Sequence, residues 1–253
     1  MTIDRPTAAQ LPQLRQLWQE AFGDTDAFLD AFFAAAMHPD RCRCVTRDGA
    51  VVAALYWFDC LYEGRKLAYL YAVATAKAYR GKGLCHALMA DTHALLEMQG
   101  YAGAILVPQS EPLRGFYETM GYACCVQLRR FDCEAVNEPC RVRCIDQQEY
   151  ARLRRELLPQ RAVVQEQETL DFLQTYAKFY AGPGFLLAAA VDGDTLQGIE
   201  LLGDAAVAPA IVGAMGCARG TFRAPGEGMP FAMYLPLGDR ELPPPAYFGL
   251  ALD

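Results

Sequence analysis

The spacing of hydrophobic residues in the first hundred positions predicts two helices followed by three strands. Leu11, Leu14 and Leu17 recur at three- and four-residue steps, which is helical spacing, and a second helix with Asp24 or Thr25 as its cap follows a break at Gly23. The segments that come next are rich in β-branched and aromatic residues and are separated by Asp-Gly and Glu-Gly turns, so we predict strands at 44–46, 51–60 and 67–75. We expect these strands to form an antiparallel meander.

The strand at 67–75 is followed by a loop with two glycines and then by a helix. The loop covers residues 77–83, and the helix runs to about Gln99, where Gly100 ends it. After the helix we predict a short buried strand at 103–107, a short helix opened by Pro112 and a strand at 122–131.

Apolar periodicity is lost around residues 132–143, and we take this stretch as the boundary between two domains, 1–135 and 136–253. In the second half we predict helices at 146–158, 166–180 and 205–215 and strands at 185–191, 196–202, 231–235 and 247–252. The nearest counterpart of the glycine loop is residues 219–226, where Pro225 would disrupt a following helix start. We therefore expect the second half not to bind the same ligand.

Composition and charge narrow the class of protein. With 253 residues, 53% of them hydrophobic, the chain is long enough for one large domain or two ordinary ones. A formal charge of −7 argues against non-specific binding to nucleic acid or to an anionic membrane. The N-terminus lacks the apolar core of a signal peptide, and no apolar run approaches the length of a membrane span. We expect a soluble, cytoplasmic protein without nucleic-acid or membrane partners.

The ten cysteines are better interpreted as reduced thiols than as a disulfide framework, because they are scattered through apolar stretches of a chain without a secretion signal. No C-x-x-C pair occurs and there are only three histidines, so we predict no metal site.

The loop after the strand at 67–75 has features typical of an anion-binding site. Residues 80–84, with glycine at 81 and 83, would bring backbone N–H groups together at a helix N-terminus, where a phosphate is stabilised, and Arg80 and Lys82 add positive charge. A plain turn with two glycines is the alternative. The mononucleotide P-loop and the dinucleotide fingerprint are both incomplete here, since His86 stands where the latter needs its last glycine.

The loop and its neighbours resemble a known family. The segment from about residue 45 to 130 is similar to the GNAT superfamily of acyl-CoA-dependent N-acetyltransferases, whose signature R/Q-x-x-G-x-G/A is matched by Arg80 and Gly83, with Cys85 in place of the final small residue. The resemblance implies an α/β (α+β) fold with a mixed, mostly antiparallel sheet flanked by helices. It also implies a tandem arrangement in which the catalytic domain is followed by a smaller, degenerate GNAT-like half.

The resemblance further implies a position for acetyl-CoA, the cosubstrate. Its pantetheine would lie in a splay between the strand ending at Thr75 and the strand ending at Val107, where backbone groups of Val73 and Thr75 would extend the sheet edge. A backbone N–H of the first strand would polarise the thioester oxygen. The residues expected to contact the cofactor are Val73, Ala74, Thr75, Arg80, Gly81, Lys82, Gly83, Leu84, Cys85 and Ser110.

Tyr117 is the candidate catalytic residue. It matches the tyrosine of the family pattern F/L-Y-x-x-x-G-F/Y at positions 116–122, and its phenol would protonate the departing CoA thiolate; packing in the core is the alternative. Ser110 stands where family members often have Asn, although Ser110-Glu111 resembles the acyl-CoA-contacting Ser-Glu of tandem aminoglycoside acetyltransferases from actinobacteria. The general base stays open among Asp59, Glu63, Glu111 and the terminal carboxylate of Asp253.

The function that these residues predict is direct transfer of an acetyl group from acetyl-CoA to a primary amine of a small-molecule or peptide acceptor. Two alternatives stay open: a CoA-binding regulatory module without catalysis, and a structural protein that kept only the fold. The second half would complete the acceptor pocket or mediate self-association into a homo-oligomer.

Overall fold

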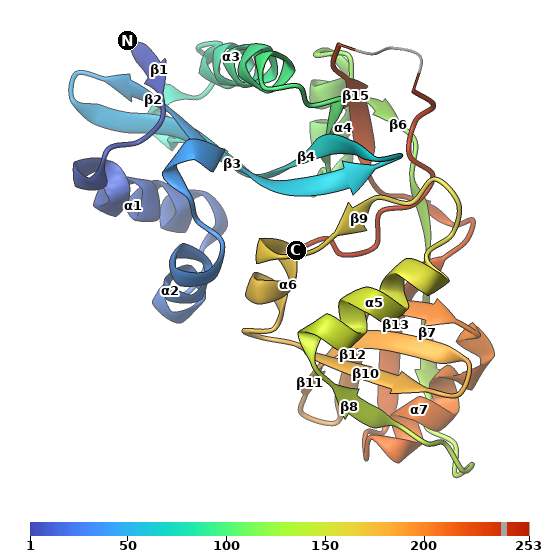
Figure 1. Ribbon diagram of the computed structural model, residues 1–253. Helices are drawn as coiled ribbons and strands as arrows, with labels where there is room; N and C mark the ends of the chain where they lie inside the picture. The colour runs from blue at the N-terminus through green and yellow to red at the C-terminus, as the bar shows by residue number, and fades with distance from the viewer. Residues whose placement is uncertain (239–241, 253) are drawn as a thin grey trace. The chain divides into compact units, whose positions relative to one another are not determined.

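The computed structural model describes residues 1–238 and 242–252, which fold into two compact units (Figure 1). The first unit comprises Met1–Ala123 and Met233–Pro243, and the second comprises Cys124–Ala232 and Pro244–Asp253. This division differs from the expected domains 1–135 and 136–253. The reason is that a strand from each half of the sequence joins the sheet of the other half, which the alternation of apolar residues within a strand does not reveal.

The first unit contains a mixed sheet with the strand order β1-β2-β3-β4-β5-β15. Its strands are β1 (Thr2–Asp4), β2 (Cys42–Arg47), β3 (Ala50–Tyr62), β4 (Arg65–Thr75), β5 (Gly103–Leu106) and β15 (Met233–Pro236). All neighbours are antiparallel except β4 and β5, which run parallel and are joined by a helix. The short strand β6 (Ala123–Cys124) lies at the boundary of the unit. The predicted meander is confirmed as β2, β3 and β4.

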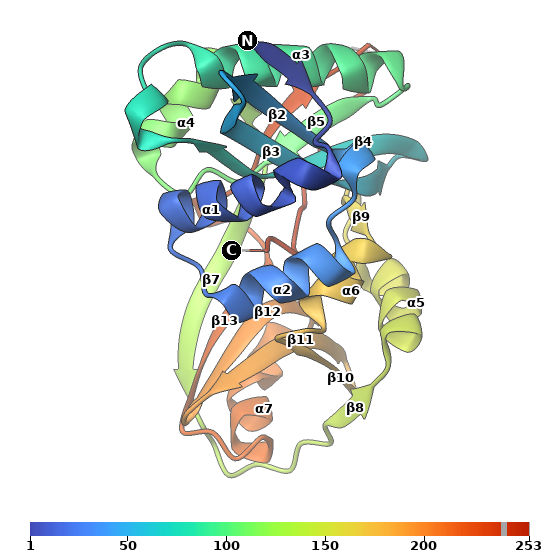
Figure 2. The same cartoon turned by 90° about the vertical axis from the view of Figure 1, so that its left-hand side faces the viewer.

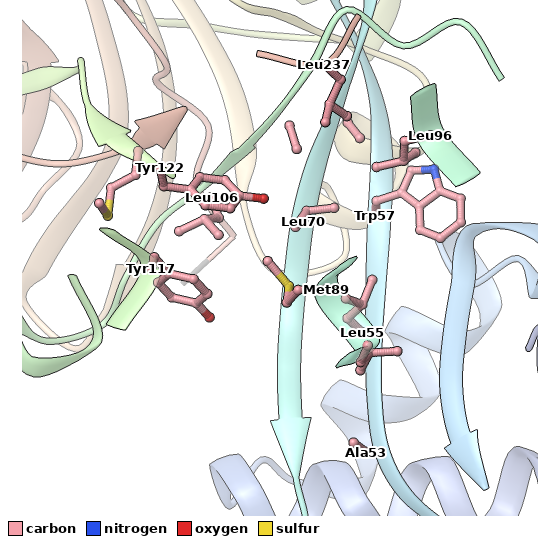
Figure 3. Close-up of a cluster of buried hydrophobic side chains, with 14 of the residues drawn as sticks. Ala53, Leu55, Trp57, Leu70, Met89, Leu96, Leu106, Tyr117, Tyr122 and Leu237 are labelled. Carbon is pink, nitrogen blue, oxygen red and sulfur yellow. The ribbon is translucent and has the colours of Figure 1, made fainter. Parts of the chain in front are cut away.

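Helices cover both faces of this sheet, as the alternation along β3 requires. Leu55 and Trp57 point into a core that includes residues of α3 (Leu84–Met98) and α4 (Glu111–Glu118) (Figure 3). Tyr56, on the opposite face, contacts Trp18 of α1 (Leu11–Phe22) and Phe32 of α2 (Asp26–Ala35). Figure 2 shows α1 and α3 on either side of the strands.

The boundary between α1 and α2 follows directly from the sequence. Gly23 ends α1 with φ 76°, a left-handed conformation that glycine adopts without a steric penalty. The side chain of Thr25 then caps α2 by accepting a hydrogen bond from the N–H of Phe28 at 3.2 Å. The predicted cap is therefore confirmed at Thr25, while Asp24 instead accepts a hydrogen bond from the Trp18 indole at 2.7 Å.

The second unit contains a sheet with the strand order β14-β7-β13-β12-β11-β10-β8. Its strands are β7 (Gln127–Glu134), β8 (Arg143–Ile145), β10 (Lys178–Gly182), β11 (Phe185–Asp192), β12 (Thr195–Gly203), β13 (Arg219–Pro225) and β14 (Met229–Pro230). Only β12 and β13 are parallel, and α7 (Ala208–Ala214) joins them. Helix α5 (Gln147–Leu157) packs on the other face of this sheet, and β9 (Val164–Gln165) and α6 (Glu168–Leu173) follow it. The expected fold class, mixed and mostly antiparallel sheets with flanking helices, is confirmed in both units.

Two predictions for the second half were wrong, and the segment compared with the glycine loop is a strand. The helix expected at 166–180 is only α6, because residues 178–182 alternate in burial and form β10. Residues 219–225, compared above with the glycine loop, form β13, in which every second side chain is buried. The strand expected at 247–252 is irregular chain whose only bridge in the described structure joins Tyr247 to Ala162. Within the described residues, no helix has the length and hydropathy needed to cross a membrane.

Candidate functional site

The glycine loop joins the end of β4 to the start of α3. Gly81 and Gly83 have φ values of 73° and 74°, in the left-handed region that other residues rarely adopt. A Cβ atom at either position would meet nothing within 4 Å, so the loop is open on its outer side. Gly83 is the N-cap of α3, and no side chain caps the helix there.

The backbone N–H groups of residues 81–86 form an uninterrupted donor run. Within the part of the chain that the structure describes, none of them has a hydrogen-bond acceptor, whereas Ala87 donates to the Gly83 carbonyl at 3.0 Å and continues the helix. Arg80 donates from Nε to the Thr75 carbonyl at 3.0 Å, and Lys82 donates from Nζ to the Ala78 carbonyl at 2.8 Å. Six free donors, two cations and a helix N-terminus together can bind an anion such as a pyrophosphate.

Strands β4 and β5 part next to this loop. Their parallel pairing extends only from Leu67 and Gly103 to Tyr69 and Ile105, whereas β4 continues to Thr75. The N–H of residue 76 donates to the residue 52 carbonyl of β3 at 2.9 Å. Because successive N–H groups of a strand point to opposite edges, those of residues 73 and 75 point to the edge that β5 leaves. An extended ligand with amide groups can pair with this open edge.

A β-bulge lies in β4 at the same place. Tyr56 pairs with Tyr71 but Ala54 pairs with Ala74, so β4 has one residue more than β3 between these pairs. Ala72 takes a φ of 49°, an unusual value for a residue with a Cβ atom. Ala72 could not be recognised from the sequence, because alanine gives no signal for a left-handed conformation.

Tyr117 lies on α4 with only 7% of its surface exposed (Figure 3). Its ring packs against those of Phe116 and Tyr122, with centroids 5.5 Å and 5.9 Å away. Burial, and to a smaller extent the nearby Cys85 thiol, raises the pKa of the Tyr117 hydroxyl well above its usual value, so the phenol is protonated at neutral pH. No described residue forms a hydrogen bond with this hydroxyl, which leaves it free to donate.

The surroundings of Cys85, His86 and His93, near the loop, indicate packing or hydrogen-bonding roles for these side chains. Burial raises the pKa of Cys85 to about 11, so the structure favours a small packing side chain over an activated thiol. Nε2 of His93 lies 2.7 Å from the Tyr122 hydroxyl, and burial lowers the His93 pKa to about 4. Nε2 of His86 lies 3.2 Å from the Thr119 hydroxyl. In the described part of the chain, no three His, Cys, Asp or Glu side chains gather as metal ligands would.

The candidate general bases are spread over the first unit. Asp59 accepts a hydrogen bond from the Tyr101 hydroxyl and pairs with Arg41 at 3.2 Å. It lies opposite Ala68 of β4, about 23 Å along the strand from Thr75 at the usual rise per residue. The structure therefore does not bring Asp59 to the loop end of β4.

The other candidate site residues, Glu63, Glu111, Ser110 and Asp253, lie in different parts of the chain. Glu63 lies in the turn between β3 and β4, outside both strands. Glu111 opens α4 and pairs with Arg114 at 3.0 Å, and exposed Ser110 precedes it as the N-cap residue. Asp253 lies outside the described residues. The structure thus brings the loop, the β4 edge and Tyr117 into one unit but selects no base.

The comparisons with known proteins bear on this geometry. The family model described as an acetyltransferase (GNAT) domain matches residues 2–125. Residues 2–125 form a GNAT domain. The free donor run, the parted strands and Tyr117 all belong to this GNAT domain. No curated protein matches the sequence of the chain.

Solved structures share the fold of both units. A GCN5-related N-acetyltransferase from Kribbella flavida is 18% identical, with a TM-score of 0.72 over 92% of this chain and 70% of that one. A probable N-acyltransferase from Enterococcus faecalis is 16% identical, with a TM-score of 0.69 over 93% and 72%. Eis1 from Mycobacterium abscessus is 10% identical, with a TM-score of 0.65 over 90% and 67%. At these identities the likeness establishes the fold, that of two-domain GNAT proteins.

Proposed function

We propose that the GNAT domain binds acetyl-CoA and transfers the acetyl group to a primary amine of a small-molecule or peptide acceptor. The observation that carries this proposal is the run of free N–H groups at residues 81–86, next to the open edge of β4. A pyrophosphate and an extended chain of amides need these two features side by side. GNAT relatives bind acetyl-CoA or CoA.

The binding roles follow from the positions of the residues. The N–H groups of Gly81, Lys82, Gly83, Leu84 and Cys85 would hold the pyrophosphate, and the Arg80 guanidinium and the Lys82 ammonium would add charge beside it.

The pantetheine would run along β4. Backbone groups of Val73 and Thr75 would pair with its amides. Ala74 lies between them and pairs with Ala54 of β3, and its small side chain would leave room for the cofactor. Ser110, which is exposed before α4, would contact the same chain.

Tyr117 would act as the proton donor. Amine attack on the thioester places negative charge first on the carbonyl oxygen and then on the departing sulfur. A backbone N–H of the β4 edge at Val73 would stabilise the oxygen, a contribution of about 3 kcal/mol for a well-placed donor. The Tyr117 hydroxyl is protonated and has no hydrogen-bond partner among the described residues, so it can donate to the sulfur.

Several further expectations belong to this proposal. They are a cytoplasmic location, the absence of nucleic-acid and membrane partners, no metal requirement, and self-association of the chain. The formal charge of −7 motivates the second of these, because it disfavours encounter with polyanions.

The test is calorimetric titration of the full chain with acetyl-CoA and with dephospho-CoA, followed by acetyl-transfer assays on a panel of amines. We expect micromolar binding, and we expect Tyr117→Phe to lower kcat by roughly 10- to 100-fold with little change in cofactor affinity. Tyr176→Phe, a tyrosine of the second unit with 38% exposure, is the matched control.

Three outcomes would count against parts of the proposal. The absence of binding at millimolar acetyl-CoA would reject the cofactor assignment. Binding without transfer to any amine of the panel would favour the non-catalytic CoA-binding module. Transfer that is unaffected by Tyr117→Phe would leave Tyr117 with its packing role alone.

A further inference from the structure

A cavity of about 480 Å³ lies in the first unit between α1 and the turn that joins β2 to β3. One wall is a single face of α1, because the lining positions 13, 16, 17 and 20 recur at three- and four-residue steps. Residues 48–51 and Ala76, which follows β4, form the other side. Ligand pockets in proteins usually measure about 300–1,000 Å³, so this cavity can hold a small organic molecule.

The walls of the cavity are joined by hydrogen bonds between α1 and the neighbouring chain. Oε1 of Gln13 accepts a hydrogen bond from the N–H of Val51 at 2.7 Å. Oε1 of Glu20 accepts one from the N–H of Lys77 at 2.7 Å, just after β4. These contacts fix the helix against the strands before any ligand arrives, which lowers the conformational cost of binding.

The charged groups of the cavity are acidic. The side chains of Glu20 and Asp48 line it, and the lining formed by the described residues contains no Lys, Arg or His. Glu20 lies in the last turn of α1, at the negative end of the helix dipole, and no basic residue lies in that turn. Asp48 lies 3.8 Å from Arg47, but both side chains are exposed, so this ion pair offsets little of the charge. A cation is therefore the favoured ligand.

The arrangement of the lining favours an organic cation with two charges. Leu17 and Val51 are buried and line the inner part of the cavity, whereas Glu20 and Asp48 are exposed. The two carboxylates come from opposite walls, one from the helix and one from the turn. An aliphatic chain can contact the apolar residues while an ammonium group at each end meets a carboxylate.

We propose that this cavity binds an aliphatic diamine, with one ammonium group at Glu20, the other at Asp48, and the methylene chain over Leu17 and Val51. Gln16, exposed on the same face of α1, supplies a neutral amide beside them. The site does not depend on the acetyl transfer proposed above, because its lining includes neither the N–H groups of residues 81–86 nor the β4 edge at 73 and 75.

The test is calorimetric titration of the full chain, without acetyl-CoA, with 1,4-diaminobutane and separately with 1-aminobutane. The variants are Glu20→Gln, Asp48→Asn and the double substitution, and the control is Glu97→Gln, an exposed carboxylate on α3 of the same unit.

Both substitutions remove a charge and spare the walls of the cavity. Glutamine keeps an oxygen that can accept the hydrogen bond from the Lys77 N–H. Residue 48 has φ 52°, and asparagine tolerates this left-handed conformation well. An amine bound at the acceptor position of acetyl transfer contributes equally in all variants, so the differences between variants report the cavity.

We expect each single substitution to weaken binding of 1,4-diaminobutane about three- to fivefold, the double substitution at least about tenfold, and the control less than about 1.5-fold. Aminobutane should bind at least about threefold more weakly than the diamine, and added salt should weaken both. Gln16→Glu adds a third carboxylate on the same helix face and should tighten binding about twofold, a gain that partial unfolding cannot produce.

Three results would overturn the proposal. They are the absence of binding at millimolar diaminobutane, an affinity that the double substitution leaves unchanged or that Glu97→Gln weakens equally, and equal affinity for the two amines.

Discussion

The two units share a topology but differ at the point where their parallel strands part and the connecting helix begins. In each, a parallel strand pair joined by a helix separates the antiparallel strands, β4-α3-β5 in the first unit and β12-α7-β13 in the second. Each pair parts after a few residues, and each first strand has a bulge, which in β12 lies at Ile199. In the first unit the parted edge and the helix start are open. In the second unit both are occupied by the chain itself.

A buried polar cluster occupies the second unit just after β12 and β13 part. Glu200 is fully buried and accepts hydrogen bonds from Arg154 at 2.7 and 2.9 Å, from the Tyr150 hydroxyl at 2.7 Å and from the Tyr247 hydroxyl at 3.0 Å. A Cβ at Gly249 would collide with the Glu200 carboxylate, so the C-terminal segment packs directly on this cluster.

The segments that lead into α3 and α7 also differ in whether a side chain satisfies the backbone donors. Neither Gly83, the N-cap of α3, nor Val207, the N-cap of α7, provides a side-chain cap. In the 3-10 turn Ala205–Val207 that leads into α7, however, Asp204 accepts a hydrogen bond from the Ala206 N–H at 2.9 Å. The second unit supplies its own carboxylate where the first leaves free donors. In this topology, backbone donors can bind an anion only where the chain itself leaves them unsatisfied.

The largest effect is expected from breaking the cluster that closes the second unit. Arg154→Met leaves the Glu200 carboxylate buried without its cation, so we expect the second unit to lose about 3–5 kcal/mol of stability. Urea denaturation followed by far-UV circular dichroism measures this. Arg155→Met is the control, because Arg155 pairs with Glu166 on the surface and should cost below about 1 kcal/mol. A loss for Arg154→Met no larger than that of the control would show that the cluster does not hold the unit together.

The next largest effect is expected at the free N–H groups of residues 81–86 in the first unit. Gly83→Glu places a carboxylate among the free N–H groups, so we expect acetyl-CoA to bind roughly 100-fold more weakly or not at all while the fold is kept. Calorimetric titration measures the affinity, and circular dichroism checks the fold. Gly216→Glu is the matched control, since Gly216 has φ 72° and an equally empty surrounding in the second unit. Unchanged affinity in Gly83→Glu would remove the loop from the binding site.

Acid should destabilise the first unit through His93. Burial lowers the His93 pKa to about 4, whereas the unfolded value is about 6.5, so the unfolded chain binds more protons between these values. Stability therefore falls as the pH drops from 6.5 to 4, by about 2 kcal/mol once partial exposure is allowed for. Trp18 and Trp57 both lie in the first unit, so their fluorescence follows its unfolding.

The His93 contribution can be isolated by substitution. His93→Leu should flatten the pH dependence over this range, and His86→Leu, on the exposed start of α3, should leave the dependence in place. An unaltered slope in His93→Leu would assign the acid sensitivity to the carboxylates instead.

The smallest effect tests the cap of the second unit. Asp204→Ala removes the acceptor for the Ala206 N–H and should cost about 1 kcal/mol of stability. Asp192→Ala removes the same charge from the last residue of β11 and serves as the control. Thermal unfolding of both variants measures the difference, and equal melting temperatures would show that the charge rather than the hydrogen bond matters.

Local features of the fold were largely predictable. Gly23 and Thr25 mark the boundary between α1 and α2, and the two glycines of the loop mark the start of α3, because each of these effects depends on a few neighbouring residues. Tyr117 and the loop were found through their motifs, not through geometry. Ala72 could not be found, because its left-handed conformation is imposed by the register between β3 and β4.

The sequence by itself determined the elements of the first unit, the glycine loop and the family resemblance, all of which rest on short-range patterns of residue type. Only the tertiary structure decided that β15 joins the first sheet and β7 the second, since strand alternation does not name a partner. It also decided which donors stay free at residues 81–86 and which charges meet at Glu200. Hydrogen-bond satisfaction and charge pairing are properties of residues brought together from distant parts of the chain, and only the folded chain contains them.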